Sequence, residues 1–264
     1  MTRTEVSRRR FMQLVGGAVA GAYTLGNIPQ ARSEAISRPD RAGGPYRWVG
    51  MYTVGNRKEC GFMVSDRVVL TAAHTLYNPH PQRRITQWPL PPITFYPATS
   101  GLVSNRPTNP YGGFRVAKCI VCPEWFGIWR EASAANQMPK GHSQYDWALL
   151  VLDRAPKEGF FGWKGTVEVD DRLDTIGYPG GIHPANTQQR FTSTVKYVNE
   201  GQIFVDSFVG DQWGGMSGGP LFRWEGDKLG WCAIGVHSRV EVSDGGSYHC
   251  RIDSSLADRI RSFS

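Results

Sequence analysis

The sequence predicts an all-β protein, and three observations support that prediction. The chain has 264 residues with 31 Gly, 17 Pro, 9 Trp, 10 Tyr and 12 Phe, which is typical of short strands and turns packed through aromatic side chains. Of its residues, 40% are hydrophobic and 20% are charged, which excludes disordered, collagen-like and coiled-coil chains and allows a substantial core. Segments of strand character also alternate with turns rich in Gly, Asn and Asp.

The strand segments can be placed along the chain. We expect strands over residues 46–54, 60–70 and 146–152, and hairpins that join 191–198 to 203–209 and 221–224 to 231–237. Residues 79–110 hold eight prolines, which disfavour a regular ladder and predict a long surface loop. Residues 253–263 begin with capping residues and place Leu256, Ile260 and Phe263 at helical spacing, which predicts a short terminal helix.

The N-terminus has the pattern of an export signal. Three arginines stand in the segment SRRRFM at residues 7–12, directly before an uncharged stretch that ends at Ala31. Gly, Thr and Asn dilute this stretch, whereas a membrane-spanning helix needs about 20 strongly apolar residues. The segment therefore resembles a twin-arginine signal, with cleavage near Ala31 or Ala35, and an uncleaved membrane anchor is the alternative. We expect residues 1–35 to hold the signal and the start of a linker, 36–45 to be a linker or pro-segment, and 46–264 to form the folded domain.

Export would place the chain in the periplasm or outside the cell and changes the interpretation of its charge and cysteines. The formal net charge is +7, but much of this excess lies in the signal, and no later run of Lys or Arg with interleaved aromatics supports nucleic-acid binding. In an oxidising compartment, most of the five cysteines are expected to form disulfides. Cys119 and Cys122 have C-x-x-C spacing, but no second Cys or His pair lies nearby in the sequence to complete a zinc site.

Three segments carry the residue types of nucleophilic catalysis. A serine hydroxyl is a poor nucleophile unless a base takes its proton, a carboxylate orients the base, and donors await the oxyanion. Ser217 lies in GGMSGGP at residues 214–220, where small residues on both sides would let a substrate carbonyl approach. His74 ends the segment VLTAAH, and Asp146 begins the segment DWALL. The α/β-hydrolase elbow G-x-S-x-G also matches around Ser217, but that fold needs its acid and histidine after the serine.

With these three motifs in the order His, Asp and Ser, residues 46–264 resemble the chymotrypsin-like serine proteases. The resemblance implies two packed six-stranded antiparallel β-barrels, an active site between them and a short C-terminal helix. It also implies that His74 is the general base, that Asp146 orients it, that Ser217 attacks, and that the N–H groups of Gly215 and Ser217 form the oxyanion hole. Such an enzyme would cleave protein or peptide substrates as a monomer, without metal or organic cofactor, nucleic acid or stable membrane insertion.

Within that family, the chain is most similar to the bacterial glutamyl-endopeptidase branch. The similarity rests on ITFYP at residues 93–97, PYG at 110–112 and IGYPG at 176–180. In that branch, a histidine at the motif position of His237 binds the carboxylate of a substrate glutamate. Asp211, by contrast, matches the position where trypsin-like enzymes bind Arg or Lys, so cleavage after Arg or Lys is the alternative. The resemblance assigns six residues to the specificity pocket: Asp211, Gln212, His237, Ser238, Val240 and Gly246.

The chain also departs from the family pattern. Met216 stands where pancreatic-type enzymes have an aspartate that pairs with a newly freed N-terminal amine, so activation by that ion pair cannot operate. Thr75 stands where many relatives have a cysteine, which leaves Cys60 without its usual partner. The resemblance further implies a disulfide between Cys232 and Cys250, because both would lie in the second barrel. An inactive binding domain on a protease scaffold is the non-enzyme alternative.

Overall fold

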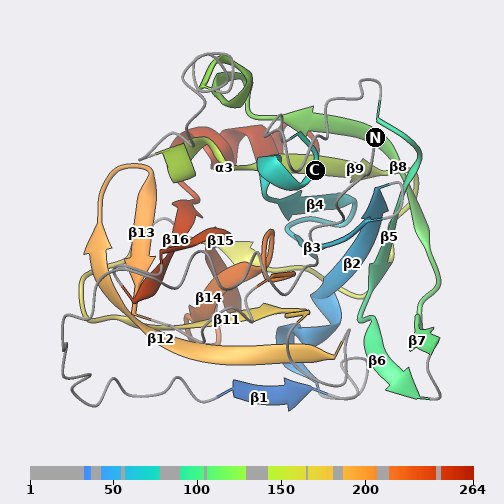
Figure 1. Cartoon of the computed structure of the whole chain (residues 1–264), viewed down its shortest axis with the longest axis horizontal. Coiled ribbons are helices and arrows are strands. Elements are labelled where there is room, and N and C mark those ends of the chain that lie inside the picture. The colour runs from blue at the N-terminus through green and yellow to red at the C-terminus, as the bar shows by residue number, and fades with distance from the viewer. Residues whose placement is uncertain are drawn as a thin grey trace, which may run out of the picture. The chain divides into compact units, whose positions relative to one another are not determined.

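The computed structural model describes the following residues: 33–36, 43–54, 57–77, 90–103, 106–128, 142–164, 166–180, 187–206, 214–241 and 245–264. Within these ranges, most of the regular structure is β-strand, and the strands form two closed six-stranded antiparallel barrels (Figure 1). The predicted all-β class, the two barrels and the short terminal helix are therefore confirmed. The expected export signal lies almost wholly outside the described residues.

The first barrel comes from the N-terminal half of the folded unit. Around the barrel, its strands are β2 (Val49–Val54), β3 (Arg57–Met63), β4 (Val68–Thr71), β9 (Ala148–Leu152), β8 (Phe114–Val121) and β5 (Ile93–Pro97). The closing pair, β5 with β2, is antiparallel like the others. β4 and β9 are almost uniformly apolar and buried, whereas in β5 buried Ile93 and Phe95 alternate with half-buried residues. These buried strands form the core of the first barrel. His74 follows β4 in the sequence, and Asp146 precedes β9.

Two predicted strands differ from the observed elements. The segment 46–54 begins as a 3-10 helix, η1 (Gly44–Trp48), because Pro45 at its start has no N–H for a ladder and a restricted φ. The segment 60–70 is not one strand but two, β3 and β4. A tight turn joins them, and the Val64 N–H closes it by donating to the Val68 carbonyl oxygen at 2.9 Å.

The proline-rich segment was predicted wrongly as a loop in its described part. β5 lies within it as a full barrel strand, and β6 (Ser100–Val103) pairs with β7 (Arg106–Thr108) in a separate two-stranded sheet. The prolines flank β5 rather than interrupt it, since Pro91 and Pro92 precede the strand and Pro97 ends it. The run Ile-Thr-Phe-Tyr between them is β-branched and aromatic, which favours a strand.

The second barrel follows in the C-terminal half. Around the barrel, its strands are β12 (Gln188–Val198), β11 (Arg172–Gly177), β14 (Pro220–Trp224), β15 (Trp231–Glu241), β16 (Gly246–Arg251) and β13 (Gln202–Val205), and β13 pairs back with β12. Two short strands extend this sheet. β10 (Gly162–Trp163) runs parallel to β15, and β1 (Ser33–Ile36) runs antiparallel to β12. β1 lies in the expected signal and linker, and cleavage near Ala31 would leave it intact.

The chain ends in α3 (Ser254–Arg261), as the sequence predicts. The Asp253 carboxylate caps the helix by accepting the N–H of Leu256 at 2.8 Å. Leu256 and Ile260 are buried in the main core cluster, and Phe263 packs against it, which matches the predicted apolar spacing. None of the helices in the described ranges has the length and hydropathy of a membrane span.

The expected disulfide between Cys232 and Cys250 is wrong for this structure, in which all five cysteines are free. Cys250 lies opposite Val236 on the neighbouring strand, four residues along from Cys232. At about 3.3 Å per residue, the two Cα atoms are offset by roughly 13 Å along the strands alone, well beyond the ~7 Å limit for a bridge. Their sulfurs also have separate partners, the carbonyl of Leu229 for Cys232 and that of Gln144 for Cys250. Membership of the same barrel was not enough, because the register decides which residues meet.

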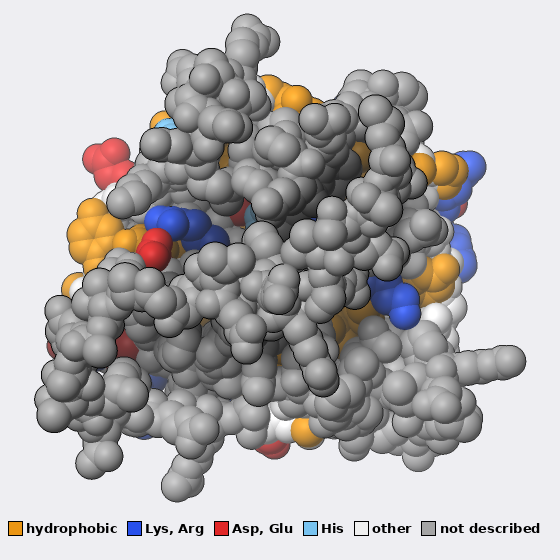
Figure 2. All heavy atoms as spheres, in the orientation of Figure 1, with side chains coloured by type: hydrophobic (Ala, Val, Ile, Leu, Met, Phe, Trp, Pro, Cys, Tyr) orange, Lys and Arg blue, Asp and Glu red, His pale blue; other side chains and the backbone are white. Residues whose placement is uncertain are grey.

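The charges on the face of the molecule seen in Figure 2 are mixed in sign. Lys and Arg side chains among the described residues lie there in separate small groups, and one group lies beside an acidic side chain. The described part of this face therefore shows no extended patch of a single charge.

Candidate active site

His74 is positioned by the end of a buried strand. β4 ends at Thr71, and the chain turns through Ala72 into the short 3-10 helix η2 (Ala73–Thr75). Ala72 and Ala73 are completely buried, so the small side chains that precede the histidine pack the turn against the barrel. The His74 side chain is 14% exposed, so it is largely but not fully buried.

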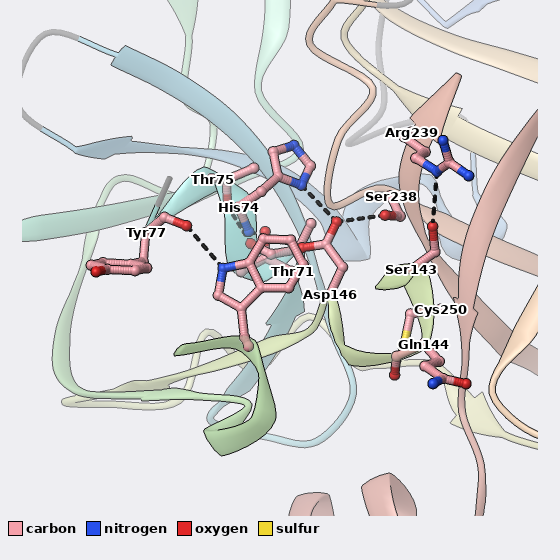
Figure 3. A network of polar contacts seen from close by, with 12 residues as sticks. Thr71, His74, Thr75, Tyr77, Ser143, Gln144, Asp146, Ser238, Arg239 and Cys250 are labelled. Atoms are coloured by element: carbon pink, nitrogen blue, oxygen red, sulfur yellow. Dashed lines mark hydrogen bonds and ion pairs between the residues drawn. The ribbon is translucent and has the colours of Figure 1, made fainter. Parts of the chain in front are cut away.

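Asp146 is brought to His74 by the pairing of β9 with β4. Thr71 lies opposite Ala148 in this ladder, so the residues just after β4 meet the residues just before β9. Asp146 accepts two hydrogen bonds from His74: the backbone N–H to Oδ1 at 2.8 Å, and Nδ1 to Oδ2 at 2.7 Å (Figure 3). Because a carboxylate only accepts, Nδ1 carries the proton and the lone pair lies on Nε2. This is the tautomer that a general base needs.

A third donor completes the environment of Asp146. The Ser238 hydroxyl donates to Asp146 Oδ2 at 2.5 Å, and both side chains are almost fully buried (Figure 3). The sequence assigned Ser238 to the substrate pocket, whereas the structure places its hydroxyl on the carboxylate. Three donors thus compensate a charge that is 2% exposed, and burying that charge without them would be costly.

Arg239 links the same region to the second barrel. Its Nε donates to the Ser143 hydroxyl at 3.3 Å, and Ser143 lies in η3 (His142–Tyr145), directly before Asp146 (Figure 3). The guanidinium group lies over the Tyr248 ring at 4.4 Å and pairs with Glu241 at 2.9 Å. The turn that carries Asp146 is therefore held against β15.

Ser217 lies in a turn that only glycines can form. Gly215 and Gly218 have positive φ angles of 101° and 85°, which L side chains rarely adopt. A Cβ at Gly215 would lie 2.3 Å from the carbonyl oxygen of Tyr178, and one at Gly218 would lie 2.1 Å from that of Cys60 and 2.3 Å from Thr71 Oγ1. The turn therefore packs closely on the backbone of Tyr178 and Cys60 and on the hydroxyl of Thr71, the last residue of the strand that leads to His74.

The Ser217 turn also leaves donors available. Among the described residues, no acceptor is bonded to the N–H groups of Gly215 or Ser217, which the resemblance assigns to the oxyanion hole. The Gly218 N–H, by contrast, donates to the His237 carbonyl at 2.9 Å. The structure gives no hydrogen bond between Ser217 and His74, and such catalytic bonds often tighten only when substrate binds.

Met216 anchors the turn through apolar contacts. Its side chain is completely buried in a cluster with Phe191 and Val240. A Cβ at Gly177 would lie 2.6 Å from the Met216 sulfur, so β11 also packs tightly on it. The position at which pancreatic-type relatives place a charged aspartate is apolar here.

The predicted pocket histidine lies deep in the second barrel. His237 is 1% exposed on β15, directly opposite fully buried His249 on β16, and the ring centroids are 4.9 Å apart. Burial, followed by the proximity of His74, lowers the pKa of His237 to about 3, although Asp146 opposes this. Burial and the neighbouring His237 likewise hold the pKa of His249 well below its usual value. Both rings are therefore neutral at neutral pH.

His249 is a candidate functional residue that the sequence analysis missed. Its Nε2 lies 3.1 Å from the Ser247 hydroxyl, so a line of polar groups continues behind His237. Only the register of β15 with β16 brings the two histidines together, and that register cannot be read from the segment SYHC alone.

The other residues predicted to line the pocket lie in different surroundings or outside the described residues. Val240 is half-buried and packs on Met216. Gly246 is explained by strand packing, since a Cβ there would lie 2.2 Å from the Val205 carbonyl oxygen. Asp211 and Gln212 lie outside the described residues.

Comparison with known proteins agrees with the two-barrel fold. The family described as Trypsin-like peptidase domain matches residues 60–230. A Glu endopeptidase solved in complex with MPD is 17% identical, with a TM-score of 0.67, and the match covers 90% of this chain and 98% of that one. The protease Anisep from Arthrobacter nicotinovorans is 18% identical, with a TM-score of 0.57, over 86% of this chain and 96% of that one. No curated protein sequence matches the chain.

Proposed function

The chain belongs to the trypsin-like peptidase family and is a serine endopeptidase, and we propose that Ser217, His74 and Asp146 carry out its reaction. The observation that supports these roles most strongly is the pair of hydrogen bonds from His74 to Asp146. They leave His74 Nε2 as the basic atom. The Ser217 turn packs on Thr71, three residues before His74.

In the proposed reaction, the Ser217 hydroxyl oxygen attacks the carbonyl carbon of the scissile bond while His74 Nε2 takes its proton. The N–H groups of Gly215 and Ser217 receive the oxyanion, and Asp146 stabilises the imidazolium. The imidazolium then protonates the amine as the C–N bond breaks, which leaves an acyl-enzyme. Water, deprotonated by the same nitrogen, attacks the ester carbonyl, and Ser217 regains its proton as the carboxylic acid leaves.

We further propose a preference for glutamate before the cut, with His237 as the recognising residue. A neutral imidazole can donate one N–H to a carboxylate, and His249 and Ser247 lie behind His237 to hold its orientation. His237 is also close enough to His74 and Asp146 for all three to interact electrostatically, which is the proximity that a residue binding the side chain beside the scissile bond requires. The alternative, cleavage after Arg or Lys, would depend on Asp211.

Digestion of a mixed peptide pool, with cut sites read by mass spectrometry, distinguishes these specificities. Glutamate specificity predicts cuts after Glu that His237→Ala reduces by roughly 10- to 100-fold, the equivalent of one hydrogen bond to a charged group. Cuts after Arg or Lys that Asp211→Ala abolishes would refute it. Ser65→Ala, which removes a buried hydroxyl in a turn of the first barrel, serves as the control and should change neither pattern.

We also propose that the enzyme is exported by the twin-arginine route to the periplasm or medium and works there as a monomer. The arginines of the segment SRRRFM support the route, since that pathway recognises the pair rather than hydrophobicity alone. Arg8→Lys combined with Arg9→Lys should leave precursor inside the cell. Unchanged export of the double variant would rule out this route.

A further inference from the structure

We propose that Tyr52 is a positioning residue for this reaction, because its hydroxyl contacts Thr71 and Thr75 on either side of His74, and the turn that carries Ser217 packs on Thr71. The inference rests on the proposed function of those two residues. No feature of the sequence singles out Tyr52, which is one of ten tyrosines.

The Tyr52 hydroxyl contacts the chain on both sides of His74. Tyr52 lies on β2 and is completely buried. Its hydroxyl oxygen is hydrogen-bonded to Thr75 Oγ1 and lies 3.1 Å from Thr71 Oγ1. Thr75 directly follows His74, and Thr71 precedes it by three residues (Figure 3). A single oxygen atom of another strand therefore fixes the start and the end of the histidine turn.

The direction of the hydrogen bonds makes Tyr52 necessary to this arrangement. Thr71 Oγ1 donates to the Cys60 carbonyl at 2.7 Å, and Thr75 Oγ1 donates to the Ala72 carbonyl. Each threonine proton is thus already used, so the single phenol proton is the one left for the two threonine oxygens, and it is shared between the closer Thr75 Oγ1 and Thr71 Oγ1. Burial, with a further contribution from Glu59, raises the pKa of Tyr52 well above its usual value, so the phenol keeps that proton at working pH.

The same group of bonds supports the Ser217 turn. Gly218 packs directly on the Thr71 hydroxyl and the Cys60 carbonyl, since a Cβ there would lie 2.3 Å and 2.1 Å from those two oxygens. Gly218, the residue after Ser217, therefore packs on the two groups that form the Thr71–Cys60 hydrogen bond. A shift of Thr71 would move the nucleophile and the base relative to each other.

This network lies where the resemblance would place a disulfide between the positions of Cys60 and Thr75. Thr75 holds the position at which the resemblance expects a cysteine, and Cys60 is free and completely buried. Three hydroxyls connect β2, β3, β4 and the histidine turn instead. The structure thus assigns to Tyr52, Thr71 and Thr75 the mechanical role of a cross-link beneath the catalytic residues.

Tyr52→Phe tests the inference because it removes one oxygen atom and leaves the ring in the core. Thr71 and Thr75 keep their bonds to carbonyl groups, so the chain should still fold. We expect kcat per active site to fall roughly 10- to 100-fold, as small misplacements of catalytic groups do, while KM stays within about twofold because no substrate contact is lost. Tyr46→Phe is the matched control, since its hydroxyl is bonded to Arg190 instead, and it should stay within about twofold in both constants.

A double-mutant cycle separates positioning from general destabilisation. Thr75→Val should reproduce most of the kcat loss of Tyr52→Phe, and the double variant should lose little more than either single variant, because both changes break the same bond. Thr75→Ser keeps the hydroxyl and should recover kcat to within a few-fold of wild type. Thr99→Val removes a hydroxyl bonded to the Tyr96 carbonyl, and its effect should combine with that of Tyr52→Phe multiplicatively.

Titration of active sites with a fluorophosphonate makes the outcome decisive. Unchanged kcat per titrated site in Tyr52→Phe, or a loss explained wholly by fewer titratable molecules, would overturn the inference. Failure of the wild-type enzyme to react with the reagent would overturn the proposed function instead. The two failures are therefore distinguishable in one set of measurements.

Discussion

The two barrels contribute to the site in different ways. The first barrel presents a buried charge, Asp146, whose oxygens accept hydrogen bonds from His74 of the same barrel and from Ser238 of the second barrel. The second barrel presents backbone and neutral groups, namely the glycines around Ser217 and the uncharged pair of His237 and His249. The base therefore depends on side-chain chemistry at strand ends, whereas the nucleophile depends on backbone conformations that a side chain would destroy. The two contributions can be broken separately.

The largest expected effect comes from removing the charge in the first barrel. Asp146→Asn should lower kcat by about 10⁴-fold, as the same change does in other Ser-His-Asp triads, because the amide no longer enforces the tautomer with the lone pair on Nε2. Steady-state kinetics measure this directly. Asp174→Asn is the control in the second barrel, where a largely buried carboxylate accepts hydrogen bonds from Arg190 and Thr192. A comparable kcat loss in the control would show that the effect is not specific to the site.

A second change targets the backbone of the second barrel. Gly218→Ala should lower kcat at least about 100-fold, because its Cβ would lie 2.1 Å from the Cys60 carbonyl oxygen and misplace Ser217. Gly226→Ala separates this clash from backbone strain. Gly226 has nearly the same φ of 82°, but nothing lies within 4 Å of its Cβ position, so it should lose some stability and no kcat. Equal kinetic losses in both variants would contradict the packing argument.

A third, smaller effect concerns the pH dependence of stability. The pKa of His237 is about 3 in the folded protein, and that of His249 is also lowered, whereas unfolded histidines titrate near 6.5. Below that pH the unfolded chain binds protons that the folded chain excludes, so stability is full above about pH 6.5 and falls as the pH decreases. The groups facing this pair are His74, Asp146 and Ser247.

Urea unfolding at pH 4 and pH 7 measures this effect. The difference in unfolding free energy between the two values should shrink in His249→Gln by up to about 1.4 kcal/mol for each pKa unit removed. His142→Gln, which changes a less buried histidine in η3, should leave the difference as in wild type. An unchanged difference in His249→Gln would mean that this histidine binds a proton as readily in the folded chain as in the unfolded one.

The sequence was most informative where local pattern and function coincide. The motifs around His74, Asp146 and Ser217 carry the resemblance to the chymotrypsin-like proteases, which implied both barrels, and the spacing of Leu256, Ile260 and Phe263 predicted the helix. Three features escaped because they depend on pairing between distant segments: the strand β5 within the proline-rich stretch, the separation of Cys232 from Cys250, and the contact of His237 with His249. Register is a property of two strands together, and neither strand alone encodes it.

The side-chain roles divide in the same way. The resemblance assigned Ser238 to the pocket, and the structure adds a role that the sequence did not suggest, because its hydroxyl bonds to Asp146. The pairing of β15 with β16 is irregular between His237 and Arg239, and His237 and Ser238 are both buried, so the direction of each side chain does not follow from the alternation of a regular strand. The sequence did not indicate a role for Tyr52, because it lies 19 and 23 residues from its partners Thr71 and Thr75.

The most direct test of the central claim is to locate the nucleophile and show that it needs its base. Wild-type protein treated with a fluorophosphonate should gain one adduct, and peptide mapping should place it on Ser217. His74→Ala should slow the labelling by several orders of magnitude, because no other base can take the serine proton. An adduct on any other residue, or labelling of Ser217 at an undiminished rate in His74→Ala, would contradict the account.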